Sequence, residues 1–172
     1  MGKYLFFDID GTLLSDVTHT VPQSAIEAIK KAKENGHHCF FCTGRSYFMT
    51  KEISFTGIED AIIANGAAVI RDGKPELQKI ISEDVVKKTL ELIEELGGGY
   101  QIIDWKYGYQ NPYTHAMFEE QFKKKFDEPV EEVFKKKSMK TMAETENNPI
   151  LKIDATFDTV EAAERFMKEL DP

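Results

Sequence analysis

The first part of the chain alternates between short apolar runs and segments in which apolar residues recur at helical spacing. Residues 4–9, 38–42 and 61–64 form nearly continuous apolar runs, which are typical of strands covered on both faces of a sheet. Residues 21–34 and about 46–54 separate these runs, and apolar side chains three or four positions apart in the longer segment predict a helix. The order strand, helix, strand, helix, strand predicts an α/β fold with a Rossmann-like, doubly wound parallel sheet.

The pattern changes in the second part of the chain. Asp72-Gly73 lies between two apolar runs and predicts a β-hairpin. Beyond this hairpin the predicted elements are helices at 82–96, 115–126 and 160–170 and strands at 100–103 and 150–156. We therefore place a domain boundary at about 80–83, which divides the chain into expected domains 1–81 and 82–172.

Two carboxylates stand at the end of the first predicted strand. The sequence of residues 5–14 is LFFDIDGTLL, so Asp8 and Asp10 directly follow an apolar run. An unpaired acid is costly to bury, and two acids at this place therefore indicate a function. We favour Mg²⁺-assisted phosphoryl transfer, with Asp8 as the nucleophile and Asp10 as the general acid and base. Gly11 and Thr12 would turn the chain around the phosphate. The alternative is a strand that ends in an Asp-Gly turn with solvated acids.

The two acids need different ionisation for these roles. A carboxylate such as Asp8 is ionised at neutral pH, because the reference pKa of aspartic acid is about 3.9. Asp10 lies two residues further on, where it can protonate the leaving-group oxygen and later take a proton from the attacking water. That role requires a raised pKa, which we expect partial burial of Asp10 to supply. Asp8 and Asp10 are also the predicted metal ligands, with Mg²⁺ as the expected cofactor.

The run DIDGTL resembles the DxDGT(L/V) signature of the haloacid dehalogenase (HAD) superfamily. The doubled Leu13-Leu14 is similar to the Cof-type sugar-phosphatase branch of that family. The resemblance implies a phosphatase that acts on a small phosphorylated metabolite, such as a sugar phosphate, through an aspartyl-phosphate intermediate. It also implies that the backbone carbonyl of Asp10 is a metal ligand. The expected architecture is a HAD-like core over 1–81 and an α/β cap domain over 82–172.

The ends of the second and third predicted strands carry further candidates for phosphate or substrate binding. In an open α/β sheet, ligands bind outside the carboxyl ends of the strands, where Thr43, Gly44, Arg45 and Asn65 fall. Thr43 stands where the family's second motif has a Ser or Thr that donates to a phosphoryl oxygen, and Gly44 would let the backbone approach. Thr43 is alternatively an ordinary helix N-cap. Arg45 either clamps the phosphate or pairs with a core acid. Asn65 either contacts substrate, as the resemblance suggests, or forms a turn.

Composition and charge narrow the choice of partners and location. The formal net charge of −8 disfavours nucleic acid as a partner, because binding its backbone needs clustered Lys and Arg. The Lys runs at 123–125 and 135–137 are more typical of solvated faces than of anion sites, since Glu residues flank both runs. No apolar run is long enough to cross a bilayer, so we expect no membrane association and a cytoplasmic location.

The two cysteines form the sequence Cys39-x-x-Cys42. A redox or metal-binding pair is one interpretation of this spacing. We favour two buried structural cysteines, because residues i and i+3 on a strand point to opposite faces of the sheet. The thiols of such a pair would not share a metal or a disulfide.

Two further motifs of the family are not found in the sequence. These are a Lys that neutralises the nucleophile and an acidic segment that completes the Mg²⁺ site. The chain is therefore expected to be truncated at its C-terminus, with an incomplete core that leaves a sheet edge open to self-association. A phosphomutase of the same fold and a catalytically dead binding or regulatory module are the alternative functions. Candidates for substrate selection are Trp105, Tyr107, Tyr109 and His115, with His19 a candidate for the entrance. The alternative is that these four are core or surface aromatic residues of the cap.

Overall fold

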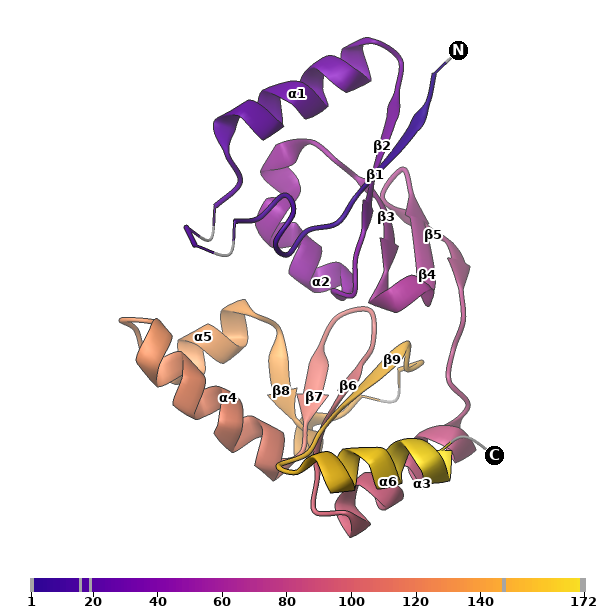
Figure 1. The fold of residues 1–172 in the computed structure, drawn as a ribbon, viewed down its shortest axis with the longest axis vertical. Coiled ribbons are helices and arrows are strands. Elements are labelled where there is room, and N and C mark those ends of the chain that lie inside the picture. Colours follow the sequence, from indigo (N-terminus) through magenta and orange to yellow (C-terminus); the bar gives the residue numbers. More distant parts are fainter. Residues whose placement is uncertain (1, 16, 19, 147, 171–172) are drawn as a thin grey trace. The chain divides into compact units, whose positions relative to one another are not determined.

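The computed structural model describes residues 2–15, 17–18, 20–146 and 148–170. The chain forms two compact units, Met1–Lys79 and Ile80–Pro172, and each unit contains a sheet of its own (Figure 1). The two units are described separately below. Within the described ranges, no helix is both long enough and apolar enough to span a membrane.

The first unit is built on a five-stranded sheet with the strands in chain order. The strands are β1 (Tyr4–Phe7), β2 (His38–Cys42), β3 (Asp60–Ile63), β4 (Ala68–Arg71) and β5 (Lys74–Gln78). The pairs β1–β2 and β2–β3 are parallel, as the alternation of strand and helix predicts. The pairs β3–β4 and β4–β5 are antiparallel, and the second of them is the hairpin predicted around Asp72-Gly73.

Helical segments connect the parallel strands of the first unit. They are α1 (Gln23–Glu34), α2 (Tyr47–Thr50) and the 3₁₀ segments η1 (Lys51–Thr56) and η2 (Ala64–Gly66). Both α1 and α2 lie on the same side of the sheet (Figure 1). Ile29 of α1 and Phe41 of β2 are buried in the core, whereas Tyr4 and Phe6 of β1 are each 55% exposed. The expectation that this strand is covered on both faces is therefore wrong within the described unit. Since β1 stands at one end of the strand order, its outer edge and this aromatic face are open.

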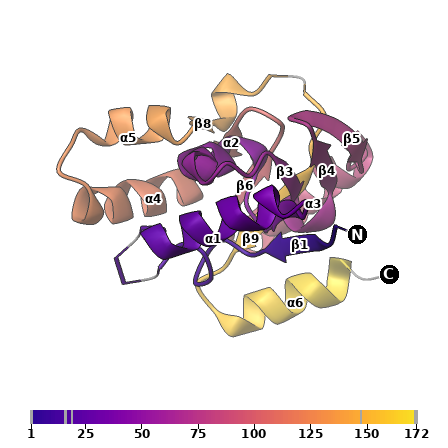
Figure 2. The ribbon, with the colours of Figure 1, turned by 90° about the horizontal axis from the view of Figure 1, so that it is seen from above.

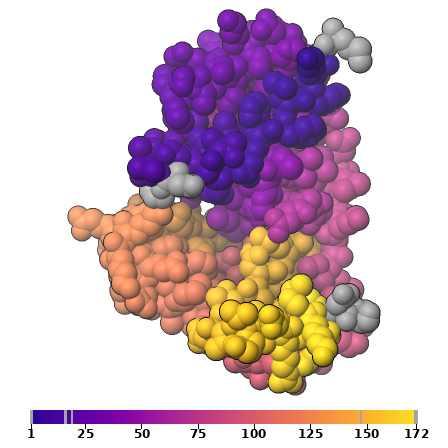
Figure 3. All heavy atoms as spheres, in the orientation of Figure 1, coloured from indigo at the N-terminus to yellow at the C-terminus, as the bar shows by residue number. Residues whose placement is uncertain are grey.

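The second unit has a four-stranded sheet in the order β8 (Met139–Thr141), β7 (Gly108–Gln110), β6 (Gly99–Ile103), β9 (Lys152–Thr156). Its helical segments are α3 (Glu83–Glu95), α4 (Pro112–Lys125), α5 (Val130–Lys136), η3 (Met142–Glu144) and α6 (Val160–Leu170). Helices α4 and α5 lie side by side (Figures 1 and 2). Helix α6 lies on the surface of the unit, where it exposes Val160 and Met167 (yellow in Figure 3).

Two apolar clusters hold the second unit together. One of them joins α3 and α6 to the sheet through Ile93, Tyr100, Ile102, Tyr109, Ile150 and Phe166. The other joins α4 to α5 through Phe122, Val130, Val133 and Phe134. Burial of apolar side chains is the main favourable term in folding, so α5 is fixed by its packing against α4 in spite of its charged sequence.

A buried carboxylate ties the β6–β7 turn to the segment before β9. Asp104 is 0% exposed. Its Oδ1 accepts hydrogen bonds from the backbone N–H groups of Lys106 and Tyr107, both at 2.6 Å. Its Oδ2 accepts from the Tyr109 hydroxyl at 3.2 Å and from Asn148 Nδ2 at 2.8 Å. Four donors therefore compensate the desolvation of this acid.

Two buried tyrosines lead us to expect a loss of stability at alkaline pH. Burial, followed by a hydrogen bond to Glu94, raises the pKa of Tyr100 to about 12. Burial and the nearby Asp104 carboxylate raise the pKa of Tyr109 to about 12. An unfolded tyrosine has a pKa of about 10. A raised folded pKa stabilises the fold fully below the unfolded pKa, and this stabilisation is lost as the pH rises from about 10 towards about 12.

The measurement is the urea midpoint of the second unit as a function of pH, followed by the fluorescence of Trp105, the one tryptophan of the sequence. We expect the midpoint to fall through the alkaline range, and to fall less steeply in Tyr100→Phe. A midpoint that falls equally in both proteins would contradict the role of the Tyr100 phenol.

The expectation of two buried cysteines is wrong for one of them. Cys39 is buried and Cys42 is exposed. Both lie on β2, and Cys42 shares a face of the sheet with Phe40, which pairs with Phe6 of β1, so its side chain lies on the open aromatic face. Their spacing of three along a strand sends the side chains to opposite faces, which agrees with the expectation that they do not form a shared redox or metal site.

Candidate active site

The turn that follows β1 presents both predicted acids to solvent. Ile9 lies between Asp8 and Asp10 and is 0% exposed, while both acids are exposed. The Ile9 carbonyl accepts from the Leu14 backbone N–H at 2.8 Å, which closes the turn, and the Gly11 N–H donates to the Leu14 carbonyl at 3.0 Å. Gly11 has a φ of 71°, in the left-handed region that suits glycine. A buried anchor thus holds a tight turn with an acid on each side.

Thr12 lies against the predicted nucleophile. Its hydroxyl donates to Asp8 Oδ2 at 3.1 Å. This bond orients the carboxylate and uses one of its several acceptor sites.

Thr43 is fixed at the end of β2 by its backbone. It is 6% exposed, and its N–H donates to the Ile62 carbonyl of β3 at 3.0 Å. Its hydroxyl oxygen accepts from the Arg45 N–H at 3.1 Å, which is a local turn contact. The alternative that Thr43 is a helix N-cap is wrong, because Ser46 is the N-cap of α2. A hydroxyl also carries one proton of its own, so Thr43 can still donate to a ligand oxygen.

Gly44 and Asn65 meet between the ends of β2 and β3. A Cβ atom added to Gly44 would lie 2.6 Å from Asn65 Oδ1, which is closer than a side chain allows. Asn65 has φ 56° and ψ 34° within η2, a conformation that asparagine tolerates better than most residues. The Asn65 N–H also donates to the Thr43 carbonyl at 3.4 Å. The predicted residues of the second and third strands therefore share one site.

Arg45 pairs with Asp10, which is one of the two roles left open by the sequence. Its Nε donates to Asp10 Oδ2 at 2.9 Å and its Nη2 donates to Asp10 Oδ1 at 2.6 Å. Its Nη1 donates to Glu52 Oε2 at 3.3 Å and to the Met49 carbonyl at 3.4 Å. Glu52 was not among the predicted site residues. It is placed by η1, whose 3₁₀ geometry the sequence pattern does not indicate.

The expectation of a raised pKa for Asp10 is wrong for this arrangement. Hydrogen bonding from Arg45 lowers the pKa of Asp10, and this outweighs the opposite effect of burial. The physical reason is exposure, because the Asp10 side chain is 57% exposed and loses little solvation. Bonds from a charged donor favour the ionised carboxylate.

The oxygen atoms of the two acids are of the type that binds a hard cation. Carboxylate and carbonyl oxygens are the ligands that Mg²⁺ prefers, and Asp8 and Asp10 offer both. Among the described residues, no group of three or more His, Cys, Asp and Glu side chains is placed to hold a metal ion. The two aspartates would therefore supply only part of the octahedral shell that Mg²⁺ requires.

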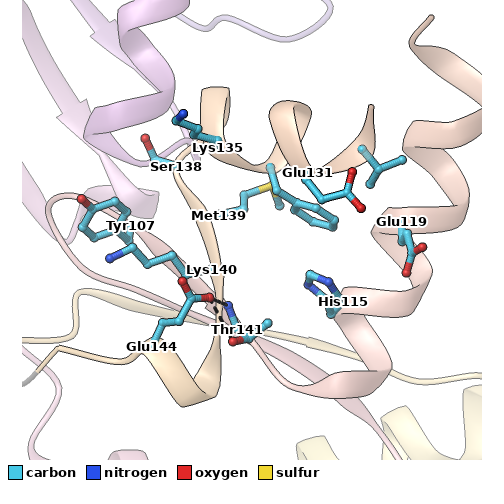
Figure 4. A pocket seen from close by; sticks show the side chains of 12 residues that line it. Tyr107, His115, Glu119, Glu131, Lys135, Ser138, Met139, Lys140, Thr141 and Glu144 are labelled. Atoms are coloured by element: carbon cyan, nitrogen blue, oxygen red, sulfur yellow. Dashed lines mark hydrogen bonds between the residues drawn. The ribbon is translucent and has the colours of Figure 1, made fainter. Parts of the chain in front are cut away.

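A pocket of about 660 Å³ in the second unit contains two of the residues proposed for substrate selection, Tyr107 and His115 (Figure 4). The His115 ring stacks on Phe134 with centroids 4.4 Å apart, and Lys140 Nζ lies 3.6 Å above the Tyr107 ring centre. Tyr109 is 0% exposed and belongs to the apolar core, which is the alternative interpretation of this residue. Trp105 is not among the residues that line this pocket, and His19 lies outside the described residues.

Comparison with known proteins identifies related sequences. A family model described as haloacid dehalogenase-like hydrolase matches residues 5–172. A putative phosphatase, YkrA, of Bacillus subtilis (strain 168) is 32% identical over 95 residues, which are 55% of this chain and 37% of that protein. A phosphoglycolate phosphatase of Methanospirillum hungatei JF-1 is 30% identical over 135 residues, which are 77% of this chain and 55% of that protein. The chain thus spans about half or less of the length of these relatives.

Solved structures share the fold. A sugar phosphatase of HAD subclass IIB has a TM-score of 0.69 at 24% identity, and the match covers 98% of this chain and 63% of that one. This likeness confirms the predicted Rossmann-like α/β fold class.

Proposed function

This chain belongs to the haloacid dehalogenase-like hydrolase family, and we propose that it forms the catalytic acid site of a Mg²⁺-dependent phosphatase. The proposed reaction is hydrolysis of the phosphate ester of a small metabolite through an aspartyl-phosphate on Asp8. One observation carries the proposal. Asp8 and Asp10 are presented at the carboxyl end of β1, and Arg45, from the end of β2, is hydrogen-bonded to Asp10.

The proposed chemistry has two steps. In the first, an Asp8 oxygen attacks phosphorus, the bond to the leaving oxygen breaks, and Asp10 donates a proton to that oxygen. In the second, Asp10 takes a proton from a water molecule whose oxygen attacks the same phosphorus, which releases inorganic phosphate and restores Asp8. Thr43, Gly44, Arg45 and Asn65 would bind the phosphoryl oxygens and the adjoining part of the substrate.

The proposed Mg²⁺ ligands in this chain are the Asp8 carboxylate and the backbone carbonyl of Asp10. When bound, the ion neutralises negative charge on the transferring phosphoryl group. Charge neutralisation matters in a protein of net charge −8, since an acidic protein repels an anionic substrate.

We further propose that residues 1–81 form the core and residues 82–172 form a cap domain that selects the substrate. The pocket that contains Tyr107 and His115 supports this, because it combines an aromatic wall with charged groups such as Lys140 and Glu144. A sugar phosphate is the proposed substrate class, which is in line with the name of the structural neighbour. The cytoplasmic location and self-association through the open β1 edge stay predictions.

A catalytically dead binding or regulatory module is the second candidate. The observation that favours it is the small number of metal-binding side chains around the two aspartates in the described part of the chain. In this case Thr43 and Arg45 would bind a phosphorylated ligand without hydrolysing it.

The test is phosphate release from p-nitrophenyl phosphate by the folded 172-residue chain, with and without added Mg²⁺. We expect release that depends on Mg²⁺ and stops when the ion is chelated. A folded sample that binds inorganic phosphate but releases none from the ester would favour the binding module. Release that is equal with and without the ion would contradict the Mg²⁺-dependent mechanism.

A further inference from the structure

Arg45 lies between two acids that hold it in different ways. The side chain of Arg45 is 12% exposed, while that of Asp10 is 57% exposed and that of Glu52 is 45% exposed. The backbone of Arg45 is also fixed, because its N–H donates to Thr43 Oγ1 at 3.1 Å and its carbonyl accepts from the Ala64 N–H at 2.9 Å. Arg45 is therefore the buried and fixed partner of the pair with Asp10, and Asp10, the most exposed of the three side chains, is the partner with room to move.

The two acids use different edges of the guanidinium. Asp10 takes the edge formed by Nε and Nη2, with both of its carboxylate oxygens accepting. Glu52 and the Met49 carbonyl take Nη1. The two sets of contacts use different N–H groups of Arg45. Arg45 can therefore lose its hydrogen bonds to Asp10 and still keep those that Nη1 donates.

Asp10 in this position is not available for proton transfer. Both of its oxygens accept from Arg45, and a general acid must instead reach the oxygen that leaves the substrate. The Nε–Nη2 edge of arginine is also the fork that binds phosphate with two parallel hydrogen bonds. A phosphate that binds to Arg45 in this way has to replace Asp10.

We propose that the phosphate of the substrate displaces Asp10 from Arg45, and that Glu52 is a positioning residue that keeps the guanidinium in place during this exchange. The exchange rests on the proposed function and adds an order of events to it. Asp10 is released for proton transfer only when a phosphate occupies Arg45. Release is local, because Asp10 is exposed and is followed by Gly11 at a φ of 71°.

The exchange can be observed directly at the Arg45 side chain. The sequence has three arginines, Arg45, Arg71 and Arg165, so the Nε–Hε region of a ¹⁵N-edited NMR spectrum contains few signals, which Arg71→Lys and Arg165→Lys assign. Inorganic phosphate is titrated into the Mg²⁺-saturated 172-residue chain. We expect the Arg45 signal to move in a saturable way while the signals of Arg71 and Arg165 stay in place.

A double-mutant cycle separates competition from a simple change of charge. If Asp10 competes with phosphate for Arg45, Asp10→Asn should tighten phosphate binding by about fivefold, the size of an exposed ion pair. In the Arg45→Lys background, which lacks the two parallel N–H donors of the guanidinium, the increase in phosphate affinity caused by Asp10→Asn should be less than about half as large. Asp8→Asn is the matched control, since it removes an equal charge that Arg45 does not hold. Its effect should be the same in both backgrounds.

The role of Glu52 has its own readout. In the phosphate-bound state, Glu52→Ala should lower the ¹H–¹⁵N NOE of Arg45 Nε, and Glu52→Gln, which keeps an acceptor oxygen, should restore it. Glu59→Ala, an exposed acid of the same unit, is the control and should leave the NOE unchanged. An NOE that is insensitive to Glu52→Ala overturns the positioning role.

The remaining outcomes separate the exchange from the proposed function. If phosphate shifts the backbone signals of Asp8 and Thr43 but not Arg45 Nε, the exchange is wrong and the phosphate site stands. Equal effects of Asp10→Asn in both backgrounds also overturn the exchange. If phosphate shifts none of these signals, both the exchange and the proposed phosphate site fall. If phosphate shifts the Arg45 Nε signal but the chain releases no phosphate from an ester, the exchange stands and the proposed hydrolysis is overturned.

Discussion

Asp8→Asn is expected to abolish Mg²⁺-dependent phosphate release, with a loss of at least about a thousandfold in turnover. An asparagine amide is not a nucleophile towards phosphorus at neutral pH, so the aspartyl-phosphate of the proposed mechanism cannot form. Stability should change little, because Asp8 is exposed and its side chain accepts a hydrogen bond of 3.1 Å from the Thr12 hydroxyl, which an asparagine oxygen can also accept. The measurement is the steady-state rate with p-nitrophenyl phosphate, together with the urea midpoint.

The matched control for this variant is Asp72→Asn. Asp72 is an exposed aspartate in the same unit, it has a φ of 49°, and asparagine tolerates this left-handed conformation. It removes the same charge far along the chain from the acid motif, and we expect its rate to equal that of the unchanged protein. If Asp8→Asn keeps more than about a tenth of the turnover, catalysis does not proceed through covalent attack by Asp8.

The sequence predicted the parallel part of the first sheet well for a physical reason. Strands that are buried on both faces must be apolar throughout, so β2 is visible as His38–Cys42 without any knowledge of its partners. The carboxyl ends of such strands are also fixed by the fold, and this brought Asp8, Thr43 and Asn65 into one predicted site.

The elements missed in the second unit lack such a signal. Strands β7 and β8 have three residues each, which is too short to show a period. Helix α5 is dominated by charged residues along the chain, and only its fold shows that Val133 and Phe134 pack against Phe122 of α4. Tertiary packing determines such segments, and local sequence does not.

The sequence indicated which residues form the site more reliably than it indicated how those residues contact one another. A sequence shows that Asp10 and Arg45 lie at neighbouring strand ends, but the choice between ion pair and phosphate clamp depends on distances. The expected rise in the pKa of Asp10 failed for the same reason. It assumed burial, whereas Asp10 is exposed and is bonded to a guanidinium through both oxygens.

Asp104→Ala is expected to destabilise the second unit by about 3 kcal/mol. The change leaves the buried Tyr109 hydroxyl and the part-buried N–H groups of Lys106 and Tyr107 without their acceptor. Unsatisfied buried donors cost more than the net value of the hydrogen bonds they lose. The measurement is urea unfolding followed by the fluorescence of Trp105, which is the next residue in the chain and the one tryptophan of the sequence.

Asp104→Asn distinguishes the loss of acceptors from the loss of charge. Its amide oxygen can still accept from the two backbone N–H groups of the turn, so we expect a smaller loss, of about 1 kcal/mol. Asp127→Ala, which removes an exposed acid of the same unit, should lie within about 0.5 kcal/mol of the unchanged protein. If Asp104→Ala were no more destabilising than Asp127→Ala, the β6–β7 turn would be held by the packing around Tyr109, and the buried carboxylate would not be what fixes the turn that carries Tyr107.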